Sequence, residues 1–288
     1  MMRELTRKAP AKINWGLDIV GKRADGYHLL RSLMQSVSLF DEVSLRAGVC
    51  DGCRCEPALP DGGDNLALRA WLLLKAELGV KDGLDIRIRK RIPVAGGLAG
   101  GSTDAAAVLL GANRLFGLGL DLAALCRIGL KLGADLPFCL TGGLALVEGI
   151  GEQVTPLAAS HTYHLLLANP GCAVSTAAVY RGFSLDKAGA HPNIGALRQA
   201  LLAGDAPGIA RHRGNMLEPP AFALQPEIAA LKQRCITLGL PALMSGSGGS
   251  VWALARDEAQ AVYGAETLRR EYPFACAVRS LAALPGND

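Results

Sequence analysis

A glycine-rich segment, PVAGGLAGGSTDAAA at residues 93–107, is the feature that most constrains how this 288-residue chain folds. Residues 84–89 alternate apolar and charged side chains and predict a half-buried strand that leads into the segment, and a helix is expected to start at Ser102. Glycines allow consecutive backbone N–H groups to approach an anion, and a helix start adds unpaired donors and the positive end of the helix dipole. The pattern therefore predicts a strand–loop–helix unit that binds phosphate.

The order of residues in this segment excludes two common phosphate-binding loops. A P-loop has Lys before its Ser or Thr, whereas Ser102 follows Gly101, and the glycines do not have the G-x-G-x-x-G spacing of dinucleotide-binding folds. A flexible turn without a ligand is the alternative interpretation. However, a run of small residues interrupted only by Leu98 would lose much conformational entropy as a simple connector, which favours the phosphate site.

Length and local patterns predict a mixed chain of helices and strands in two domains, because 288 residues exceed the usual size of one domain. Periodicity is lost over residues 151–162, so the domain boundary is expected there, between residues 157 and 158. Strands are predicted at 144–148 and 163–168, helices at 64–79 with Asp64 as the cap, 121–132, 194–202, 226–238 and 257–270, and a strand–glycine turn–strand unit at 242–255.

Charge and composition exclude several classes of protein. The net charge is +4 with dispersed Lys and Arg, and aromatic residues are 5% of the chain, so no basic stripe or base-stacking surface for nucleic acid stands out. No apolar run approaches the ~18 to 20 residues of a membrane span, and residues 1–8 lack the apolar stretch of a signal peptide. We expect a soluble, cytoplasmic protein that acts on a small anionic molecule.

The spacing of Cys50, Cys53 and Cys55 superficially resembles that of a metal site. A structural zinc ion needs four ligands, and neither a fourth cysteine nor a histidine lies within residues 48–64. We interpret the three as free thiols on a loop, with a zinc-stabilised interaction domain as the alternative. The five other cysteines stand singly in apolar surroundings, which is typical of small core residues in a reducing compartment.

Lys12 interrupts an apolar strand predicted at residues 9–17. It either reaches solvent from an edge strand or is a fixed cation that faces a phosphate or a reacting hydroxyl. Asp135 follows a predicted helix and is flanked by the apolar Ala134 and Leu136, where an unpaired carboxylate would be costly. We therefore expect Asp135 to pair with Lys12.

Two turns could contact a ligand. An Asp-Gly turn at residues 25–26 is followed by Tyr27 and His28, and it forms either a hairpin tip or a platform for a heterocycle. The small residues of 244–250 form either a plain hairpin or a turn whose backbone a ligand can approach closely.

In their order along nearly the whole chain, five segments resemble the GHMP kinase superfamily: residues 9–14, 23–30, 93–107, 133–138 and 244–248. The sequence Ala-Asp-Gly-Tyr-His within the second segment narrows the resemblance to members whose substrate carries a cytidine diphosphate group. The resemblance implies an α+β fold with the two-domain GHMP kinase architecture. Its ribosomal-protein-S5-like N-terminal domain, residues 1–157, would have a βαβ arrangement and bind ATP, and its ferredoxin-like C-terminal domain, residues 158–288, would bind the substrate.

The implied reaction is transfer of the γ-phosphoryl group of ATP to the 2-hydroxyl of a cytidine-diphosphate-linked methylerythritol, in the non-mevalonate isoprenoid pathway. Asp135 would accept the hydroxyl proton, and Lys12 would keep that carboxylate ionised and help to neutralise the transferring group. Ser102 or Thr103 would face the Mg²⁺ that accompanies ATP. The residues that would bind ATP are Pro93, Val94, Ala95, Gly96, Gly97, Leu98, Ala99, Gly100, Gly101, Ser102 and Thr103, of which Ala95 and Ala99 stand where many relatives have Gly and Thr103 replaces a frequent Ser.

The same resemblance assigns contacts to the substrate. Tyr27 and Tyr180 would sandwich the cytosine ring, and His28 would bond the edge of the base. Asn14 and Thr176 would position the substrate near its diphosphate. Asn65 and Lys90 lie where relatives place residues beside the adenine pocket.

Two alternatives remain open. Another small-alcohol kinase of the superfamily would share Lys12, the glycine loop and Asp135, but it would have no use for a cytosine clamp at Tyr27 and His28. A non-catalytic nucleotide-binding relative should lack both Lys12 and Asp135. Neither nucleic acid nor a membrane is expected as a partner, and the chain is expected to be a monomer or a weak homodimer.

Overall fold

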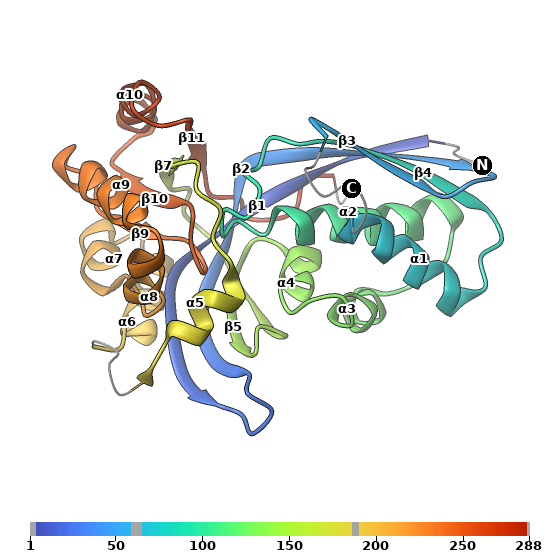
Figure 1. Cartoon of the computed structure of the whole chain (residues 1–288), viewed down its shortest axis with the longest axis horizontal. Coiled ribbons are helices and arrows are strands. Elements are labelled where there is room, and N and C mark those ends of the chain that lie inside the picture. Colours follow the sequence, from blue (N-terminus) through green and yellow to red (C-terminus); the bar gives the residue numbers. More distant parts are fainter. Residues whose placement is uncertain (1–3, 59–64, 186–189, 287–288) are drawn as a thin grey trace.

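Two β-sheets flanked by helices make up the computed structural model, which describes residues 4–58, 65–185 and 190–286 (Figure 1). The larger sheet has the order β3-β4-β2-β1-β8, with β5 paired to β2 and β6 paired to β5, and the smaller has the order β11-β7-β10-β9. The larger sheet contains β1 (Glu4–Lys22), β2 (His28–Gly48), β3 (Gly52–Glu56), β4 (Gly83–Arg89), β5 (Leu144–Gly149), β6 (Gln153–Leu157) and β8 (Gly214–Asn215). The smaller sheet contains β7 (His164–Asn169), β9 (Ala242–Met244), β10 (Val251–Ala255) and β11 (Phe274–Arg279).

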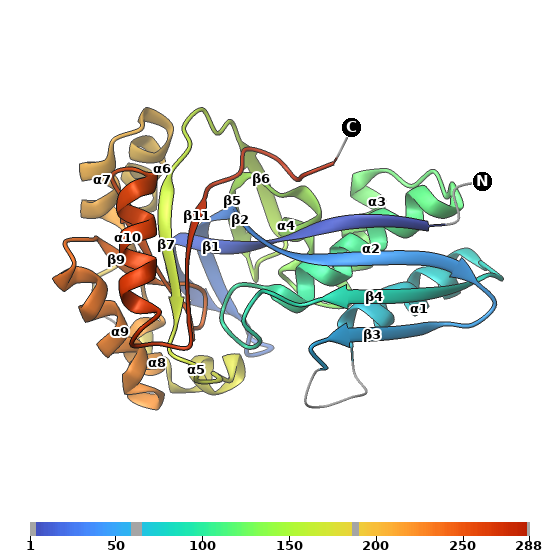
Figure 2. The same ribbon diagram turned by 90° about the horizontal axis from the view of Figure 1, so that it is seen from above.

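The helices fall into two groups that follow the two sheets (Figure 2). In the described part of the chain, none of them is long and apolar enough to cross a membrane. Beside the larger sheet lie α1 (Leu66–Leu78), α2 (Gly100–Phe116), α3 (Leu122–Leu130) and α4 (Leu136–Thr141). The helices that follow β7 in the chain are α5 (Thr176–Gly182), α6 (Ile194–Ala203), α7 (Ala206–His212), α8 (Glu218–Leu224), α9 (Pro226–Thr237) and α10 (Glu258–Leu268).

The strand order of the smaller sheet agrees with the predicted ferredoxin-like fold. Its first strand in the chain, β7, lies between the last, β11, and the third, β10, and all neighbouring strands are antiparallel. Helices precede β9 and β11 in the chain, whereas β9 and β10 are joined by a turn, so the order is strand–helix–strand–strand–helix–strand. In the larger sheet, β3 and β4 are parallel and are joined through α1, which is the βαβ arrangement expected of the N-terminal half.

Most of the predicted helices and strands are confirmed, with some differences at their ends. Helix α1 is capped by the side chain of Asn65 and not by Asp64, which lies outside the described residues. Asp121 caps α3 as expected, but α3 ends at Leu130. Strand β6 was not expected, because Pro156 and the mostly exposed side chains of this segment leave no alternation of buried apolar residues.

The predicted boundary between residues 157 and 158 lies between β6, in the larger sheet, and β7, in the smaller sheet. Strand β8 is an exception, since it comes after this boundary in the chain but pairs in parallel with β1 at Gly16 and Leu17. Backbone pairing therefore connects the two halves of the molecule in addition to side-chain packing.

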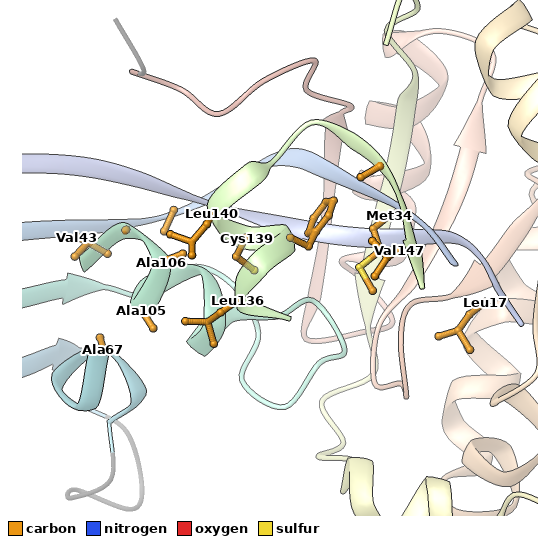
Figure 3. Packing of buried hydrophobic residues seen from close by; sticks show 14 of the residues in the cluster. Leu17, Met34, Val43, Ala67, Ala105, Ala106, Leu136, Cys139, Leu140 and Val147 are labelled. Carbon is orange, nitrogen blue, oxygen red and sulfur yellow. The ribbon is translucent and has the colours of Figure 1, made fainter. Parts of the chain in front are cut away.

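Small residues let α2 lie close to its neighbours. Ala105 and Ala106 of α2 belong to the same buried cluster as Leu136 and Leu140 of α4 (Figure 3). Burial of each leucine contributes about 1.5 to 3 kcal/mol relative to leaving it exposed. This packing holds the start of α4, and with it Asp135, in one place.

The structure corrects part of the interpretation of the cysteines. Cys53 and Cys55 lie on β3 and not on a loop, while Cys50 lies in the turn before that strand. All three thiols are free, and no group of three or more His, Cys, Asp or Glu side chains among the described residues could hold a metal ion. Of the five cysteines expected in the core, only Cys139 and Cys235 are fully buried.

Asp51 connects the turn before β3 to α1 and β4. One carboxylate oxygen accepts hydrogen bonds from the indole N–H of Trp71 at 2.6 Å and from the backbone N–H of Leu84 at 3.1 Å, and the other accepts from Lys75 Nζ at 2.8 Å. Burial acts to raise the pKa of Asp51, but the bonds from Lys75, Trp71 and Leu84 outweigh it and keep the pKa below its ordinary value.

We expect Asp51→Asn to lower the free energy of unfolding by about 1 kcal/mol at neutral pH. Because the folded-state pKa is depressed, the stabilisation by this carboxylate is present above the unfolded-state pKa and is lost as the pH falls through the folded-state pKa. Denaturant unfolding at about pH 7 and about pH 3 should therefore show a difference between wild type and variant that shrinks in acid. Asp82→Asn, at an exposed position, is the control and should change little. A difference of equal size at both pH values would contradict the assignment.

Candidate active site

A cavity of about 880 Å³ is lined by residues from both halves of the molecule. This volume is within the range of sites that enclose small organic ligands. Among the predicted site residues, it is lined by Lys12, Asn14, Tyr27, His28, Asn65, Lys90, Pro93, Val94, Ala95, Gly96, Gly97, Ala99, Gly100, Gly101, Ser102, Asp135, Thr176 and Tyr180.

Leu98 and Thr103 are the two predicted residues that do not line the cavity. Leu98 is 1% exposed and packs in the cluster that contains Trp15, so its side chain anchors the loop. Thr103 is also 1% exposed, and its position on α2 turns it away from the cavity that Ser102 lines. Ser102, and not Thr103, is therefore the hydroxyl that can face a metal ion bound with a nucleotide.

The backbone of the glycine loop leaves room for an anion at the start of α2. Ala95, Gly97 and Ala99 all have positive φ, at 52°, 72° and 57°. Ala99 precedes α2 without a side-chain cap, so the first N–H groups of this helix have no capping partner from that residue. A Cβ added to Gly101 would meet nothing within 4 Å, which means that open space lies beside this turn. These features fit the phosphates of a nucleotide.

Lys12 is a buried cation aimed at the loop. It is 4% exposed, follows a register shift in the pairing of β1 with β2, and donates from Nζ to Gly97 O and to Asn14 Oδ1, both at 2.9 Å. No carboxylate of the described residues forms an ion pair with it, so the expected direct pair with Asp135 is not formed. Its two partners are neutral oxygens, so no carboxylate of the described residues competes with an anionic ligand for this side chain.

Asp135 lies at the N-cap position of α4, where its side chain makes no capping hydrogen bond. It is half-buried and lines the cavity. Burial raises the pKa of the neighbouring Cys139 thiol, the Asp135 carboxylate raises it further, and the Lys12 ammonium lowers it. The charges of Lys12 and Asp135 both shift the pKa of this one buried thiol. The two side chains therefore lie in the same region, although no bond joins them.

An aromatic group forms another part of the cavity wall. The His28 ring stacks on Tyr180 at a centroid distance of 5.4 Å and meets the edge of Phe183 at 5.6 Å. Tyr27 lies at the tip of the β1–β2 hairpin and is 61% exposed. Burial and the charge of Lys22 lower the pKa of His28, so the ring is favoured in its neutral form, with one donor and one acceptor nitrogen. His28, rather than Tyr27, covers Tyr180 in this structure.

Asn14 and Thr176 use their polar atoms within the protein. Asn14 is fully buried, accepts from Lys12 Nζ and from the Gly246 N–H at 2.9 Å, and donates to Ser32 Oγ at 2.8 Å. Thr176 shares a hydrogen bond of 2.8 Å with Ser247, whose side chain also lines the cavity. Asn14 therefore orients the lysine directly, a role that its assignment to the substrate diphosphate did not include.

Asn65 and Lys90 are also engaged in the protein. Asn65 caps α1 and donates from Nδ2 to Cys55 Sγ at 3.1 Å. Lys90 pairs with Asp41 and, at 2.7 Å, with Asp104. Burial acts to lower the pKa of Lys90, but the carboxylates of Asp104 and Asp41 raise it above its ordinary value.

Several residues of the cavity were not predicted. Asp104 lies in the glycine-rich segment at 93–107, and Ser247 lies in the small-residue turn at 244–250. Both therefore belong to segments that the sequence already marks as able to contact a ligand. The larger apolar residues of the cavity had no such signal, because a leucine that lines a cavity has the same sequence pattern as a leucine in a core. These residues are Leu17, Leu30, Met34, Leu66, Leu132, Ile150 and Val174.

Comparisons with known proteins show which family the chain resembles. The family profile described as GHMP kinases N terminal domain matches residues 65–143, and the profile described as GHMP kinases C terminal matches residues 197–273. The chain is 41% identical over 272 residues to the 4-diphosphocytidyl-2-C-methyl-D-erythritol kinase of Acetivibrio thermocellus, covering 93% of this chain and 96% of that protein. It is 42% identical over 261 residues to the kinase of the same name from Bacillus cereus, covering 89% of this chain and 90% of that protein.

Solved structures show the same similarity. A crystal structure of 4-(cytidine 5'-diphospho)-2C-methyl-D-erythritol kinase superposes with a TM-score of 0.83 and 38% identity, over 96% of this chain and 99% of that chain. A homoserine kinase from Cytophaga hutchinsonii superposes with a TM-score of 0.76 and 23% identity, over 99% of this chain and 97% of that chain, which shows the fold alone.

Substitution at Gly97 should separate the loop from the turn it touches. A Cβ there would lie 2.2 Å from Ser245 O and 2.7 Å from Gly248 O, on a backbone with φ of 72°. We expect Gly97→Ala to lower the free energy of unfolding by about 2 kcal/mol or more in denaturant titrations. Gly101→Ala, in a helix and beside open space, is the matched control and should be at least as stable as wild type. Equal stability of the two variants would refute the close contact.

Proposed function

The chain belongs to the 4-diphosphocytidyl-2-C-methyl-D-erythritol kinases of the GHMP kinase family, and on this premise we propose how its own residues carry out the reaction of the non-mevalonate isoprenoid pathway. The 2-hydroxyl of the cytidine-bearing substrate attacks the γ-phosphorus of ATP, and ADP leaves. The single observation that carries the proposal is the cavity itself, in which Lys12, the glycine loop, Asp135 and an aromatic group share one space.

Positioning and charge supply most of the catalysis in phosphoryl transfer, because the transferred group needs little covalent help. The first N–H groups of α2 and the loop backbone bind the phosphates of ATP. Lys12 is held by Gly97 O and Asn14 Oδ1, so its charge is available to the transferring phosphoryl group. Asp135 accepts the proton of the attacking hydroxyl.

A Mg²⁺ ion bound with ATP would neutralise charge on its phosphates. Ser102, which lines the cavity, would hold the ion through its hydroxyl, directly or through water. The described residues contain no cluster of three carboxylate, His or Cys ligands for an independent metal site, so the ion depends on the nucleotide for its remaining ligands.

The cytidine end of the substrate binds at the aromatic group. Tyr27 and Tyr180 stack on the two faces of the cytosine ring, and His28 bonds its edge as a neutral imidazole. Because His28 covers Tyr180 in this structure, stacking of cytosine on Tyr180 requires the imidazole to move aside. In this proposal the substrate diphosphate lies beside Thr176 and Asn14, which both line the cavity.

The roles of the two domains, the location and the oligomeric state follow from the same family membership. Residues 1–157 bind ATP and residues 158–288 contribute Thr176 and Tyr180 to the substrate site. The enzyme acts in the cytoplasm as a monomer or a weak homodimer, which gel filtration with light scattering would check.

Coupled measurement of ADP release tests the activity. Purified protein with ATP, Mg²⁺ and 4-diphosphocytidyl-2-C-methyl-D-erythritol should turn over, and mevalonate, homoserine and galactose should give little or no ADP. Turnover of one of these alcohols in preference to the cytidine compound would instead favour another small-alcohol kinase of the family.

Asp135→Asn should reduce turnover by on the order of a hundredfold or more, because the amide cannot accept the hydroxyl proton, while the affinities for both substrates stay within about tenfold. Steady-state kinetics with each substrate varied in turn measures both effects. Asp121→Asn, at the N-cap of α3 and away from the cavity, is the matched control, since Asn caps helices as well as Asp. Near wild-type turnover in the Asp135 variant would remove this residue from the base role.

Tyr27→Ala should weaken binding of the cytidine-bearing substrate by about tenfold or more, through loss of stacking, and leave the affinity for ATP nearly unchanged. Isothermal titration with each ligand separately measures the two affinities. Tyr263→Ala, at a site that is 67% exposed on α10, controls for loss of a surface tyrosine. Similar losses for both ligands would argue against the cytosine clamp.

A further inference from the structure

Lys12 and Asn14 lie on a short stretch of β1 that has an irregularity at each end. The pairing of β1 with β2 shifts in register between Pro10 and Lys12 and again between Asn14 and Gly16. Such bulges change the direction of nearby side chains and are frequent beside active sites. Both polar side chains are buried and line the cavity. Their direction therefore depends on the contacts that hold this stretch.

Ser32 of β2 holds the second of these irregularities. It is fully buried and does not line the cavity. Its hydroxyl donates to Gly16 O at 2.7 Å, and this bond uses the one hydroxyl proton, because a carbonyl oxygen can only accept. The remaining lone pairs of Ser32 Oγ can only accept. Asn14 must therefore present its N–H₂ group to this oxygen, which lies 2.8 Å from Asn14 Nδ2.

The other end of the Asn14 amide meets two groups that can only donate. Lys12 Nζ and the backbone N–H of Gly246 both lie 2.9 Å from Asn14 Oδ1. An amide that faces an acceptor at one end and donors at the other has a single favourable orientation. Of these three contacts, the one with Ser32 acts on the N–H₂ end and keeps the oxygen turned toward the lysine.

The position of the Lys12 ammonium depends on two oxygens, Asn14 Oδ1 and Gly97 O. A lysine has a flexible four-carbon stem, so an ammonium held by one oxygen has more freedom than one held by two. Small displacements of a group that acts on a reacting phosphate lower the rate strongly. A loss of order at Asn14 is therefore expected to affect the reaction through Lys12, even though the lysine itself is unchanged.

We propose that Ser32 is a positioning residue for phosphoryl transfer and acts through Asn14 on the Lys12 ammonium. The proposal rests on the role of Lys12 in the proposed function. Because Ser32 does not line the cavity, it has no contact with either substrate, and its effect belongs to the transfer step rather than to binding.

Ser32→Ala removes the acceptor that faces the Asn14 N–H₂ group. We expect kcat to fall by about tenfold, the effect of one hydrogen bond, because Gly97 O still holds Lys12. KM for ATP and for the cytidine-bearing substrate should each stay within about threefold of wild type. Steady-state kinetics with each substrate varied in turn measures these values.

Ser280→Ala is the matched control. Ser280 is also buried, accepts a hydrogen bond at 2.9 Å from the backbone N–H of Tyr163, and does not line the cavity. This variant loses a buried hydroxyl and its hydrogen bond, as Ser32→Ala does, but it should keep the kcat of wild type. Thermal unfolding of both variants shows how much each loss costs in stability.

A double-mutant cycle separates positioning through Asn14 from a separate effect of the serine. Asn14→Ala should lower kcat at least as much as Ser32→Ala, because it removes the bond to Lys12 outright. In the Asn14→Ala background, Ser32→Ala should cause no further loss of kcat. If the alanine variant at Ser32 does not fold, Ser32→Cys takes its place in the cycle, since a thiol occupies a similar space but hydrogen-bonds weakly.

Three results would overturn the proposal. They are wild-type kcat in Ser32→Ala, losses that multiply in the double variant, and an equal loss of kcat in Ser280→Ala. The second would show that the serine acts independently of Asn14, and the third would assign the effect to stability. Failure of wild type to phosphorylate the cytidine compound would instead contradict the proposed function.

Discussion

One backbone contact between the two halves of the molecule determines the position of several groups that line the cavity. The glycine loop meets the turn at 245–248 so closely that Gly97 has no room for a Cβ. The carbonyl oxygen of Gly97 accepts hydrogen bonds from Lys12 Nζ at 2.9 Å and from Ser245 Oγ at 3.0 Å. Because three groups meet at this oxygen, the ammonium, the phosphate loop and the turn cannot move independently of one another.

The strain in the loop shows that tertiary contacts impose its shape. Ala95 and Ala99 have left-handed backbone conformations, which cost an alanine about 1 to 2 kcal/mol each. The buried side chain of Leu98, the bond from the Lys12 N–H to Leu98 O and the bond from the Ser250 N–H to Gly96 O hold the loop against this cost. A loop held in this way presents its N–H groups without further rearrangement, which favours binding of an anion.

The charges around the cavity divide it into three regions. Lys12 and the start of α2 bring positive charge to the cavity. Asp135 brings a carboxylate that forms no ion pair within the described residues. The cluster of Asp104, Lys90 and Asp41 sets two carboxylates against one ammonium.

Local signals in the sequence were sufficient for the elements that it predicted, though not for β6, and for most of the polar residues that line the cavity. Alternation predicted β4, a capping aspartate predicted the start of α3, and the motifs predicted Lys12 and Asp135 as cavity residues. The partners of these side chains could not be predicted, since Lys12 bonds to Gly97 85 residues away and Asn14 bonds to Gly246 232 residues away. A pattern in the sequence reports local conformation and burial, whereas the hydrogen bonds that a buried polar atom makes depend on which distant segments the folded chain brings together.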